Sequence, residues 1–374
     1  MLKRYYQDLS KYLKSNKVLL IYGPRQVGKT TLLKKYLAKS KLKYKIESGD
    51  NIRIQSVLGS QDFDQILGFA KGYDLIAIDE AQQIPNIGMA LKILIDEMPN
   101  LTLIATGSSS FDLAQSVGEP LTGRKTTLTL YPISQIELLN RYNDYELTQK
   151  LEESLLFGGY PDIVVANNRE EKIALLKELV DAYLLKDILA LENIKKSDTL
   201  LKLVQLLAFQ IGQLVSTHEL ATKLGIDVKT VDRYLDLLQR SFVIAKLGGF
   251  SRNLRNEITK KCKYYFLDLG VRNAVIAQFN PLDLRQDVGQ LWENFVFIER
   301  MKKNAYTGFY GNTYFWRTYD GQEIDFIEDI EGTLHGFETK WSKKNLSPPK
   351  AWKGTYPDAT FTQITPDNYL KHVT

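Results

Sequence analysis

Short apolar runs alternate with helical spacing over residues 1–140, and this alternation predicts a parallel α/β sheet. Three runs stand out, namely Val18–Tyr22, Leu75–Ile78 and Leu101–Thr106. Apolar runs of this length without polar alternation are typical of strands that are buried on both faces. The alternating residues 126–131 predict a further strand. We therefore expect an α/β core in this region.

The pattern changes to helical spacing in residues 141–195, which we interpret as a helical lid over the core. Phe157–Pro161 interrupts the segment. Lids of this kind close over a bound ligand, and Gly158 and Gly159 would act as the hinge. A plain turn between two helices is the alternative.

Residues 196–250 have the spacing of a winged helix-turn-helix. Ser216–Glu219 resembles a capping box that opens a short helix, and Gly225 ends this helix. A second helix and a strand-like wing follow, so that the second helix would bind DNA. Three aspartates dilute its positive charge, and protein contact is the alternative. Its outward-facing residues would be Lys229, Thr230 and Arg233.

The remaining residues, 251–374, predict a second α/β domain. An apolar helix at Leu291–Glu299 precedes strand-like runs at 313–317, 323–327 and 334–340. This order of elements predicts a domain separate from the first one.

Composition and charge are those of a soluble globular protein with more than one domain. The chain has 374 residues, of which 44% are apolar and 25% charged, and its net charge is only +5. The total charge therefore does not indicate a polyanionic partner. The single cysteine, Cys262, excludes an internal disulfide and a cysteine-based zinc site. No apolar stretch approaches the roughly 20 residues that span a bilayer, and the N-terminus does not resemble a signal peptide, so we expect a cytoplasmic protein with no membrane partner.

Residues Gly23–Thr30 read GPRQVGKT and fit the phosphate-binding loop G-x-x-x-x-G-K-[ST]. The loop lies between an apolar strand and a helical segment, which is the context that the motif requires. Its N–H groups and the positive end of the following helix would surround the phosphates of ATP. Lys29 would reach the β- and γ-phosphates, and the Thr30 hydroxyl would bind Mg²⁺. The residues expected to bind the nucleotide are Gly23, Pro24, Arg25, Gln26, Val27, Gly28, Lys29, Thr30 and Thr31.

A second acidic site follows the next apolar run. Asp79 would hold Mg²⁺ and Glu80 would polarise the attacking water, which makes Glu80 and Lys29 candidate catalytic residues. The strand after it ends near Thr106 and Ser108. Either hydroxyl is a candidate sensor of the γ-phosphate, and an ordinary turn is the alternative.

Arg124 is a candidate arginine finger, which would make it a third catalytic residue. It would act on its own nucleotide site or on that of a neighbouring subunit in a homo-oligomer. A surface arginine is the alternative.

The C-terminal region contains three carboxylates and a lysine that could form a single site. Glu338 and Lys340 lie two residues apart on a predicted strand and so share a face. Asp325 lies on the preceding strand and Glu293 on the preceding helix. Such a set can hold Mg²⁺, here through Asp325 and Glu338, and activate water for phosphodiester cleavage, with Lys340 orienting the water and Glu293 completing the metal shell. A cross-strand salt bridge on an ordinary sheet is the alternative.

Two basic stretches suit contact with nucleic-acid phosphates, although both also fit a solvated surface. The first comprises Arg252, Arg255, Lys260, Lys261 and Lys263. The second comprises Lys340, Lys343, Lys344, Lys350 and Lys353, with Trp341 and Trp352 between them.

Together these motifs resemble a group of prokaryotic AAA+-type P-loop ATPases. Members of this group join a P-loop domain to a winged helix and to a C-terminal domain of unassigned function that resembles the PD-(D/E)XK nuclease fold. The resemblance covers nearly the full chain, implies ATP hydrolysis and a restriction-endonuclease-like C-terminal domain, and leaves the biological role open. It rests on Gly23–Leu32, Ile78–Gln82, Thr106–Ser109 and Gly158–Pro161, and on Glu293, Asp325, Glu338 and Lys340.

We therefore expect four domains, at 1–140, 141–195, 196–250 and 251–374, with ATP and Mg²⁺ as ligand and cofactor. The first hypothesis is an ATP-hydrolysing protein that couples its nucleotide state to DNA binding or Mg²⁺-dependent cleavage. The second is an ATP-switched DNA- or protein-binding regulator whose C-terminal domain is catalytically silent. A small-molecule kinase fits poorly, because it needs neither the Asp79–Glu80 pair nor two further domains.

Overall fold

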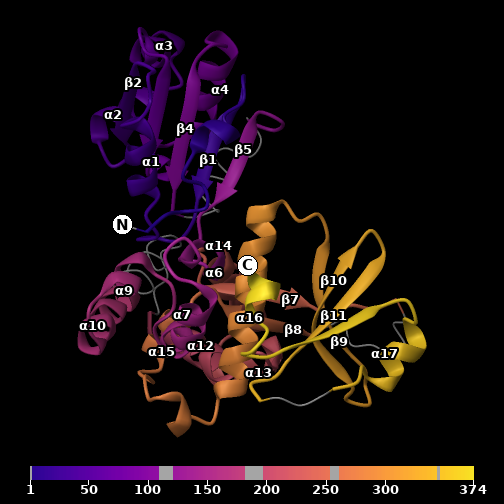
Figure 1. The fold of residues 1–374 in the computed structure, drawn as a ribbon. Helices are drawn as coiled ribbons and strands as arrows, with labels where there is room; N and C mark the ends of the chain where they lie inside the picture. Colours follow the sequence, from indigo (N-terminus) through magenta and orange to yellow (C-terminus); the bar gives the residue numbers. More distant parts are fainter. Residues whose placement is uncertain (1, 109–120, 182–196, 253–260, 343–345) are drawn as a thin grey trace. The chain divides into compact units, whose positions relative to one another are not determined.

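The computed structural model describes residues 2–108, 121–181, 197–252, 261–342 and 346–374. The chain forms two compact units, the first with one sheet and the second with two, and each unit has apolar core residues of its own (Figure 1). The finer division into four domains stays a prediction. The N-terminal unit holds Lys3–Tyr131 and Arg240–Phe242, and the C-terminal unit holds Pro132–Gln239 and Val243–Thr374 together with Leu2.

The N-terminal unit is built on a five-stranded sheet in the order β2-β3-β4-β1-β5, in which every neighbouring pair is parallel. The parallel sheet predicted from the apolar runs is thereby confirmed. Its strands are β1 (Val18–Tyr22), β2 (Tyr44–Ser48), β3 (Leu75–Asp79), β4 (Thr102–Gly107) and β5 (Lys125–Thr129).

Helices flank this sheet and contribute to its core. Val18, Leu20 and Tyr22 of β1 pack in one apolar cluster with residues of α2, α3 and α4. Because successive strand residues point to opposite faces, this alternation places the three helices on one side of the sheet. The helices are η1 (Leu9–Tyr12), α1 (Lys29–Leu37), α2 (Ile52–Leu58), α3 (Phe63–Ala70), η2 (Ala81–Gln83) and α4 (Ile87–Glu97).

The C-terminal unit contains a group of helices and a small antiparallel sheet in the order β6-β8-β7. Ser216 caps α13 by accepting a hydrogen bond from the Glu219 N–H at 3.3 Å, and Gly225 ends the helix at a φ of 65°. The helices are α6 (Gln135–Leu138), α7 (Asp144–Gln149), α8 (Leu151–Phe157), α9 (Pro161–Val165), α10 (Arg169–Leu179), α12 (Ser197–Phe209), α13 (Thr217–Leu224), α14 (Val228–Arg240) and α15 (Leu269–Val275). The strands are β6 (Leu214–Val215), β7 (Ile244–Gly248) and β8 (Cys262–Phe266).

A four-stranded sheet in the order β12-β11-β10-β9 follows in the same unit. Strand β12 is parallel to β11, and the other pairs are antiparallel. Within the described ranges, neither α16 nor any other helix is long and apolar enough to cross a bilayer. The elements are η4 (Leu282–Leu284), α16 (Val288–Thr307), β9 (Asn312–Arg317), β10 (Glu323–Ile330), β11 (Thr333–Thr339), α17 (Lys350–Thr355), β12 (Thr360–Ile364) and α18 (Leu370–Val373).

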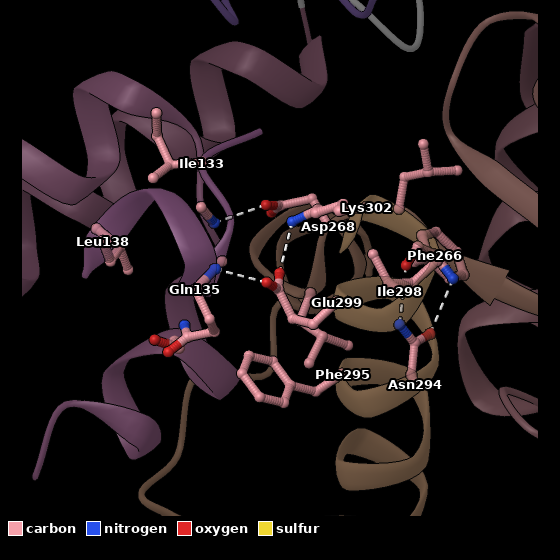
Figure 2. A pocket seen from close by; sticks show the side chains of 15 residues that line it. Ile133, Gln135, Leu138, Phe266, Asp268, Asn294, Phe295, Ile298, Glu299 and Lys302 are labelled. Carbon is pink, nitrogen blue, oxygen red and sulfur yellow. Dashed lines mark hydrogen bonds and ion pairs between the residues drawn. The ribbon is translucent and has the colours of Figure 1, made fainter. Parts of the chain in front are cut away.

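The described helices of the segment predicted as a lid pack inside the C-terminal unit, where α8 lies against α15. Gly158 has a φ of 73°, and a Cβ there would lie 2.0 Å from the Asp268 carboxylate. The Gly159 N–H donates to the same carboxylate at 2.7 Å, beside a small cavity that Glu299 and Lys302 also line (Figure 2). Close packing, rather than the expected hinge motion, therefore explains these two glycines.

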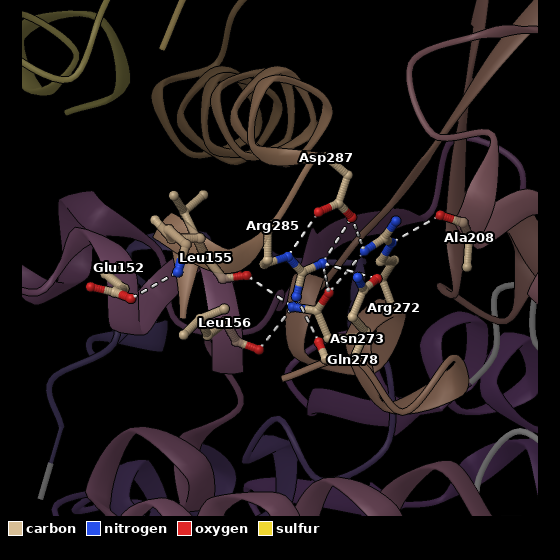
Figure 3. Close-up of polar contacts among 10 residues, drawn as sticks. Glu152, Leu155, Leu156, Ala208, Arg272, Asn273, Gln278, Arg285 and Asp287 are labelled. Carbon is tan, nitrogen blue, oxygen red and sulfur yellow. Dashed lines mark hydrogen bonds and ion pairs between the residues drawn. The ribbon is translucent and has the colours of Figure 1, made fainter. Parts of the chain in front are cut away.

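A buried polar network fastens α8 and α15 to each other (Figure 3). Arg272 and Arg285 share the Asp287 carboxylate, with N–O distances of 2.7 and 2.8 Å. The Asn273 amide donates to the carbonyls of residues 155 and 156 at 3.0 and 2.9 Å. These carbonyls belong to the last turn of α8, so the network satisfies groups that a helix end leaves open.

Candidate functional site

The predicted phosphate-binding loop curls between β1 and α1 in the N-terminal unit. Gly23, Gln26 and Gly28 have φ angles of 152°, 59° and 93°, a region in which glycine meets little strain. A Cβ at Gly23 would lie 2.0 Å from the Leu130 carbonyl oxygen, so the loop packs too closely for any other residue. Gly28 then forms the N-cap of α1, which begins at Lys29.

The side chain of Lys29 folds back onto its own loop. Its Nζ donates to the carbonyls of Gly23 and Pro24 at 2.9 and 2.8 Å, and the residue is only 4% exposed. Burial lowers the pKa of Lys29 to about 8, although Glu80 and Asp79 partly offset this effect. The ammonium group is therefore held by neutral partners at the position where the motif places the phosphates.

The carboxyl ends of β1, β3 and β4 bring Asp79, of the predicted acidic site, to the phosphate-binding loop. The Thr30 hydroxyl donates to Asp79 at 2.7 Å, and the Thr106 hydroxyl donates to the other oxygen of the same carboxylate. Thr106 also accepts the Glu80 N–H at 3.3 Å. A hydroxyl beside a carboxylate is the oxygen donor set that Mg²⁺ prefers, so Thr30 and Asp79 fit the predicted metal.

Glu80 lies directly after β3 and is held by Gln82, a residue of the Ile78–Gln82 stretch for which no role was expected. Its φ is 49°, and its carboxylate accepts the Gln82 amide at 2.5 Å. The same amide nitrogen lies 3.0 Å from the Ser108 hydroxyl, while Gln82 Oε1 is buried without a hydrogen-bond partner. No spacing rule points to Gln82, because its role depends on the turn that η2 makes after Glu80.

Arg124 lies at the opposite edge of the sheet from the phosphate-binding loop. The parallel register pairs Lys125 with Val18, so Arg124 stands beside the start of β1, whereas the loop follows its end at Tyr22. Five strand residues separate these edges by roughly 16 Å. The guanidinium instead pairs with Asp96 of α4 at 2.6 Å. The expectation that Arg124 acts on its own site is therefore wrong, and action on a neighbouring subunit stays a prediction.

The C-terminal unit brings the predicted carboxylates and lysine to one region of its larger sheet. Lys340 donates to Glu338 at 2.7 Å, so these two residues pair along one segment of chain and not across two strands, as the salt-bridge alternative would have it. Asp325 of β10 accepts both the N–H and the hydroxyl of Thr339 at 2.7 Å. The second carboxylate oxygen of Glu338 is buried without a hydrogen-bond partner.

Two residues of the small sheet complete this carboxylate cluster. Lys263 of β8 is 1% exposed, and its Nζ lies 3.0 Å from Glu293 and 2.6 Å from Glu323. The Tyr265 hydroxyl donates to the same oxygen of Glu293 at 2.6 Å. Lys263 was expected in a solvated basic stretch, but it is buried together with Tyr264–Phe266, which follow it in β8.

The electrostatics of this cluster follow from burial and from like charges. Burial raises the pKa of Glu293 to about 7, with Lys263 opposing the rise and Asp325 adding to it. Burial also raises the pKa of Glu338 to about 7, again with Asp325 adding to it. Burial alone lowers the pKa of Lys263, but the carboxylates of Glu293, Asp325 and Glu323 raise it above its ordinary value.

The metal shell expected from Glu293, Asp325 and Glu338 is not assembled in the structure. Among the residues that the structure describes, no group of three or more histidine, cysteine, aspartate or glutamate side chains is placed to hold a metal ion. Each carboxylate instead has a separate partner of its own, which is Lys263 for Glu293, Thr339 for Asp325 and Lys340 for Glu338.

The basic residues expected to contact nucleic acid are scattered over the C-terminal unit. Lys229 and Arg233 of α14 are exposed, and Arg252 donates to the Gly332 carbonyl at 3.0 Å. Arg255, Lys260, Lys343 and Lys344 lie outside the described residues.

Comparison with known proteins gives family matches along most of the chain. Residues 15–139 match a family described as an AAA domain. Residues 148–282 and 288–362 match two families described as domains of unknown function, DUF8612 and DUF4143.

The relatives found by sequence are uncharacterized proteins. One from Mycobacterium tuberculosis is 29% identical over 327 residues, which cover 86% of this chain and 70% of that protein. One from Haemophilus influenzae is 27% identical and covers 87% of this chain and 82% of its own length. One from Methanocaldococcus jannaschii is 25% identical and covers 97% of this chain and 87% of its own length.

Among solved structures, a signal transduction ATPase with numerous domains and a tetratricopeptide repeat sensor, from Pyrococcus horikoshii, aligns at 14% identity with a TM-score of 0.25. The alignment covers 77% of this chain but spans less than half, 44%, of that chain. A TM-score this low carries no argument about the fold. The AAA-domain match and the loop geometry together support a P-loop ATPase domain that binds ATP within residues 15–139.

Proposed function

We propose that the N-terminal unit hydrolyses ATP. The observation that carries this proposal is the buried ammonium of Lys29, whose described partners are two loop carbonyls, next to the Thr30–Asp79 contact. A triphosphate offers this ammonium charged oxygens in place of neutral ones, so binding relieves the cost of its burial.

Each residue of the site has a distinct part in the proposed reaction. The loop N–H groups and Lys29 bind and orient the phosphates. Thr30 and Asp79 would hold Mg²⁺, which neutralises phosphate charge when it is bound. Glu80 accepts the proton of the attacking water, and its present hydrogen bond to Gln82 must give way when it does so.

Two substitutions test the proposal because they separate binding from hydrolysis. Lys29→Ala should lose both Mg-ATP binding and hydrolysis. Glu80→Gln should still bind Mg-ATP in calorimetry, while its rate of phosphate release should fall by at least about a hundredfold. Lys34→Ala is the matched control, because Lys34 is exposed on the same helix. Normal phosphate release by Lys29→Ala would contradict the proposal.

We further propose that the C-terminal unit couples the nucleotide state to nucleic-acid binding through a winged helix-turn-helix. The support is the order α13, α14 and β7, with Lys229 and Arg233 exposed on α14. Phosphate release measured with and without single- and double-stranded DNA tests this link. Stimulation by DNA that is lost in Lys229→Ala/Arg233→Ala supports it, and an unchanged rate contradicts it.

Cleavage by a nuclease-like domain is the second candidate for the C-terminal unit. The order α16, β9, β10, β11, α17 and β12 and the unpartnered buried oxygen of Glu338 favour it. The ion pairs within the cluster favour the silent regulator instead. DNA cleavage in the presence of Mn²⁺ tests this candidate. Cleavage by the wild type that is abolished in Asp325→Ala supports the nuclease, and equal cleavage by the two proteins supports the regulator.

A further inference from the structure

Arg4 joins the phosphate-binding loop to the segment that follows β5. One guanidinium nitrogen donates to the Val27 carbonyl at 2.5 Å, and the other donates to the Tyr131 carbonyl at 2.5 Å. The planar fork of an arginine suits two acceptors held at a fixed separation, which a lysine cannot bridge in the same way. A single side chain thus fixes two backbone groups that are distant in sequence.

The contact with Val27 bears directly on phosphate binding. The Val27 carbonyl and the Gly28 N–H belong to one trans peptide plane, so they point in opposite directions. Because Arg4 holds the carbonyl, it also holds the direction of the Gly28 N–H, which is one of the loop groups expected to bind phosphate. Val27 is fully buried, so without Arg4 its carbonyl would lose a partner that water cannot easily replace.

The loop also touches the same segment from its other end. The Leu130 N–H donates to the Tyr22 carbonyl at 2.7 Å, directly before the loop. The Leu130 carbonyl lies so close to Gly23 that a Cβ there would clash. Residues 130 and 131 therefore contact the loop at its first glycine and, through Arg4, at its centre.

These contacts lie where the chain passes between its two units. The chain enters the N-terminal unit between Leu2 and Lys3 and leaves it between Tyr131 and Pro132. Arg4 follows the first of these passages by two residues and binds the last carbonyl before the second. A change in the loop conformation thus reaches two of the covalent connections between the units through one side chain.

We propose that Arg4 is a positioning residue that sets the phosphate-binding conformation of the loop and transmits its nucleotide state to the Tyr131–Pro132 connection. This inference rests on the proposed nucleotide site. We assign Arg4 this positioning role because its guanidinium donates to two backbone carbonyls, those of Val27 and Tyr131.

Arg4→Ala tests the first half of the inference by Mg-ATP affinity. We expect the dissociation constant of Mg-ATP to increase about tenfold, since one loop N–H group is no longer held in its orientation. Arg4→Lys should recover only part of the affinity, because it keeps the charge but not the fork. Lys3→Ala is the matched control, because Lys3 is exposed, carries the same charge and directly precedes Arg4. This variant should bind Mg-ATP like the wild type.

Hydrogen exchange tests the second half and separates it from a merely structural role. Nucleotide binding should change the exchange of wild-type amides both in the loop and at residues 130–134. In Arg4→Ala at saturating nucleotide, the change in the loop should remain and the change at residues 130–134 should disappear. Circular dichroism should confirm that the variant is folded, and Arg4→Lys repeats the measurement if it is not.

The outcomes of the two proposals are distinguishable. A wild-type protein that binds no Mg-ATP contradicts the proposed function. A wild type that binds, with Arg4→Ala and Arg4→Lys equal to it in affinity and in exchange at residues 130–134, leaves the proposed function intact and overturns the role of Arg4.

Discussion

The two units each bury a lysine, and the two lysines have opposite surroundings. Lys29 in the N-terminal unit is 4% exposed and Lys263 in the C-terminal unit is 1% exposed, so burial does not distinguish them. Lys29 donates to two carbonyls, whereas Lys263 lies between the carboxylates of Glu293 and Glu323. The partners, and not the depth, decide what each ammonium can do.

The pKa shifts of the two lysines express this difference. Burial lowers the pKa of Lys29 to about 8, while the carboxylates around Lys263 outweigh its burial and raise its pKa. An anion that reaches Lys29 would give the ammonium a charged partner in place of two neutral carbonyls. An anion near Lys263 would have to compete with the carboxylates of Glu293 and Glu323. The first site is therefore open to a phosphate, and the second is already compensated.

The largest expected effect is the loss of the Lys263 ammonium. Lys263→Met leaves the largely buried Glu293 without its cation, while the partly exposed Glu323 keeps its ion pair with Arg317, and the loss should destabilise the C-terminal unit by about 3–5 kcal/mol. All four tryptophans, Trp292, Trp316, Trp341 and Trp352, lie in this unit. Denaturant unfolding followed by tryptophan fluorescence therefore measures the change.

Lys261→Met is the matched control for this substitution. Lys261 is exposed and lies two residues away, so its loss should change the unfolding free energy by less than about 1 kcal/mol. Equal stability of Lys263→Met and Lys261→Met would show that the cluster does not depend on its internal cation.

The sequence predicts the nucleotide site better than the carboxylate cluster for a physical reason. The loop residues are consecutive, and Asp79 and Thr106 reach them because parallel strands end at one edge of a sheet. Lys263 and Tyr265 instead reach Glu293 from a separate small sheet, and no local pattern encodes that contact.

The same distinction explains the remaining differences. The register of β5 with β1 removes Arg124 from its own site, and a register between distant strands cannot be derived from the residues alone. Gly158 and Gly159 have the composition of a hinge, but their close contact with Asp268 appears only in the folded unit. Arg4 carries no sequence signal, since both of its acceptors are backbone carbonyls.

A smaller effect is expected when Lys29 is replaced in the absence of nucleotide. The pKa of Lys29 is about 8 in the folded protein and about 10.4 in an unfolded chain. Below pH 8 both states are protonated, and the folded state bears the full cost of the buried charge. Lys29→Met should therefore be more stable than the wild type at pH 7, by up to about 3 kcal/mol.

The pH dependence gives the sign of this prediction. Between pH 8 and about 10.4 the folded state releases its proton first, so wild-type stability rises with pH and the gap to Lys29→Met shrinks. Calorimetric unfolding of the N-terminal unit across this range measures the gap, with the exposed Lys34→Met as control. A gap that is constant with pH would mean that Lys29 does not bear an uncompensated charge.

The smallest effect concerns Glu338, whose partner Lys340 is more accessible than either buried lysine. Burial and Asp325 raise the pKa of Glu338 to about 7, against about 4.3 in an unfolded chain. The folded state therefore holds a proton longer, and wild-type stability falls as pH rises from about 4 to about 7. The glutamine of Glu338→Gln does not titrate, so the stability of this variant relative to the wild type should increase across this window. We expect an increase of only about 1–2 kcal/mol, because the Lys340 side chain is 39% exposed and water screens the pair.

A second substitution shows whether Lys340 compensates Glu338 as Lys263 compensates Glu293. In a Lys340→Met background the carboxylate loses its ion pair and its pKa rises further, so the stability gained from Glu338→Gln should grow at pH 8, where the wild-type carboxylate is ionised. Tryptophan-monitored urea unfolding between pH 4 and pH 8 measures both gaps in the same unit. An unchanged gap would place the compensation of Glu338 elsewhere and would leave Lys263 as the cation on which the cluster depends.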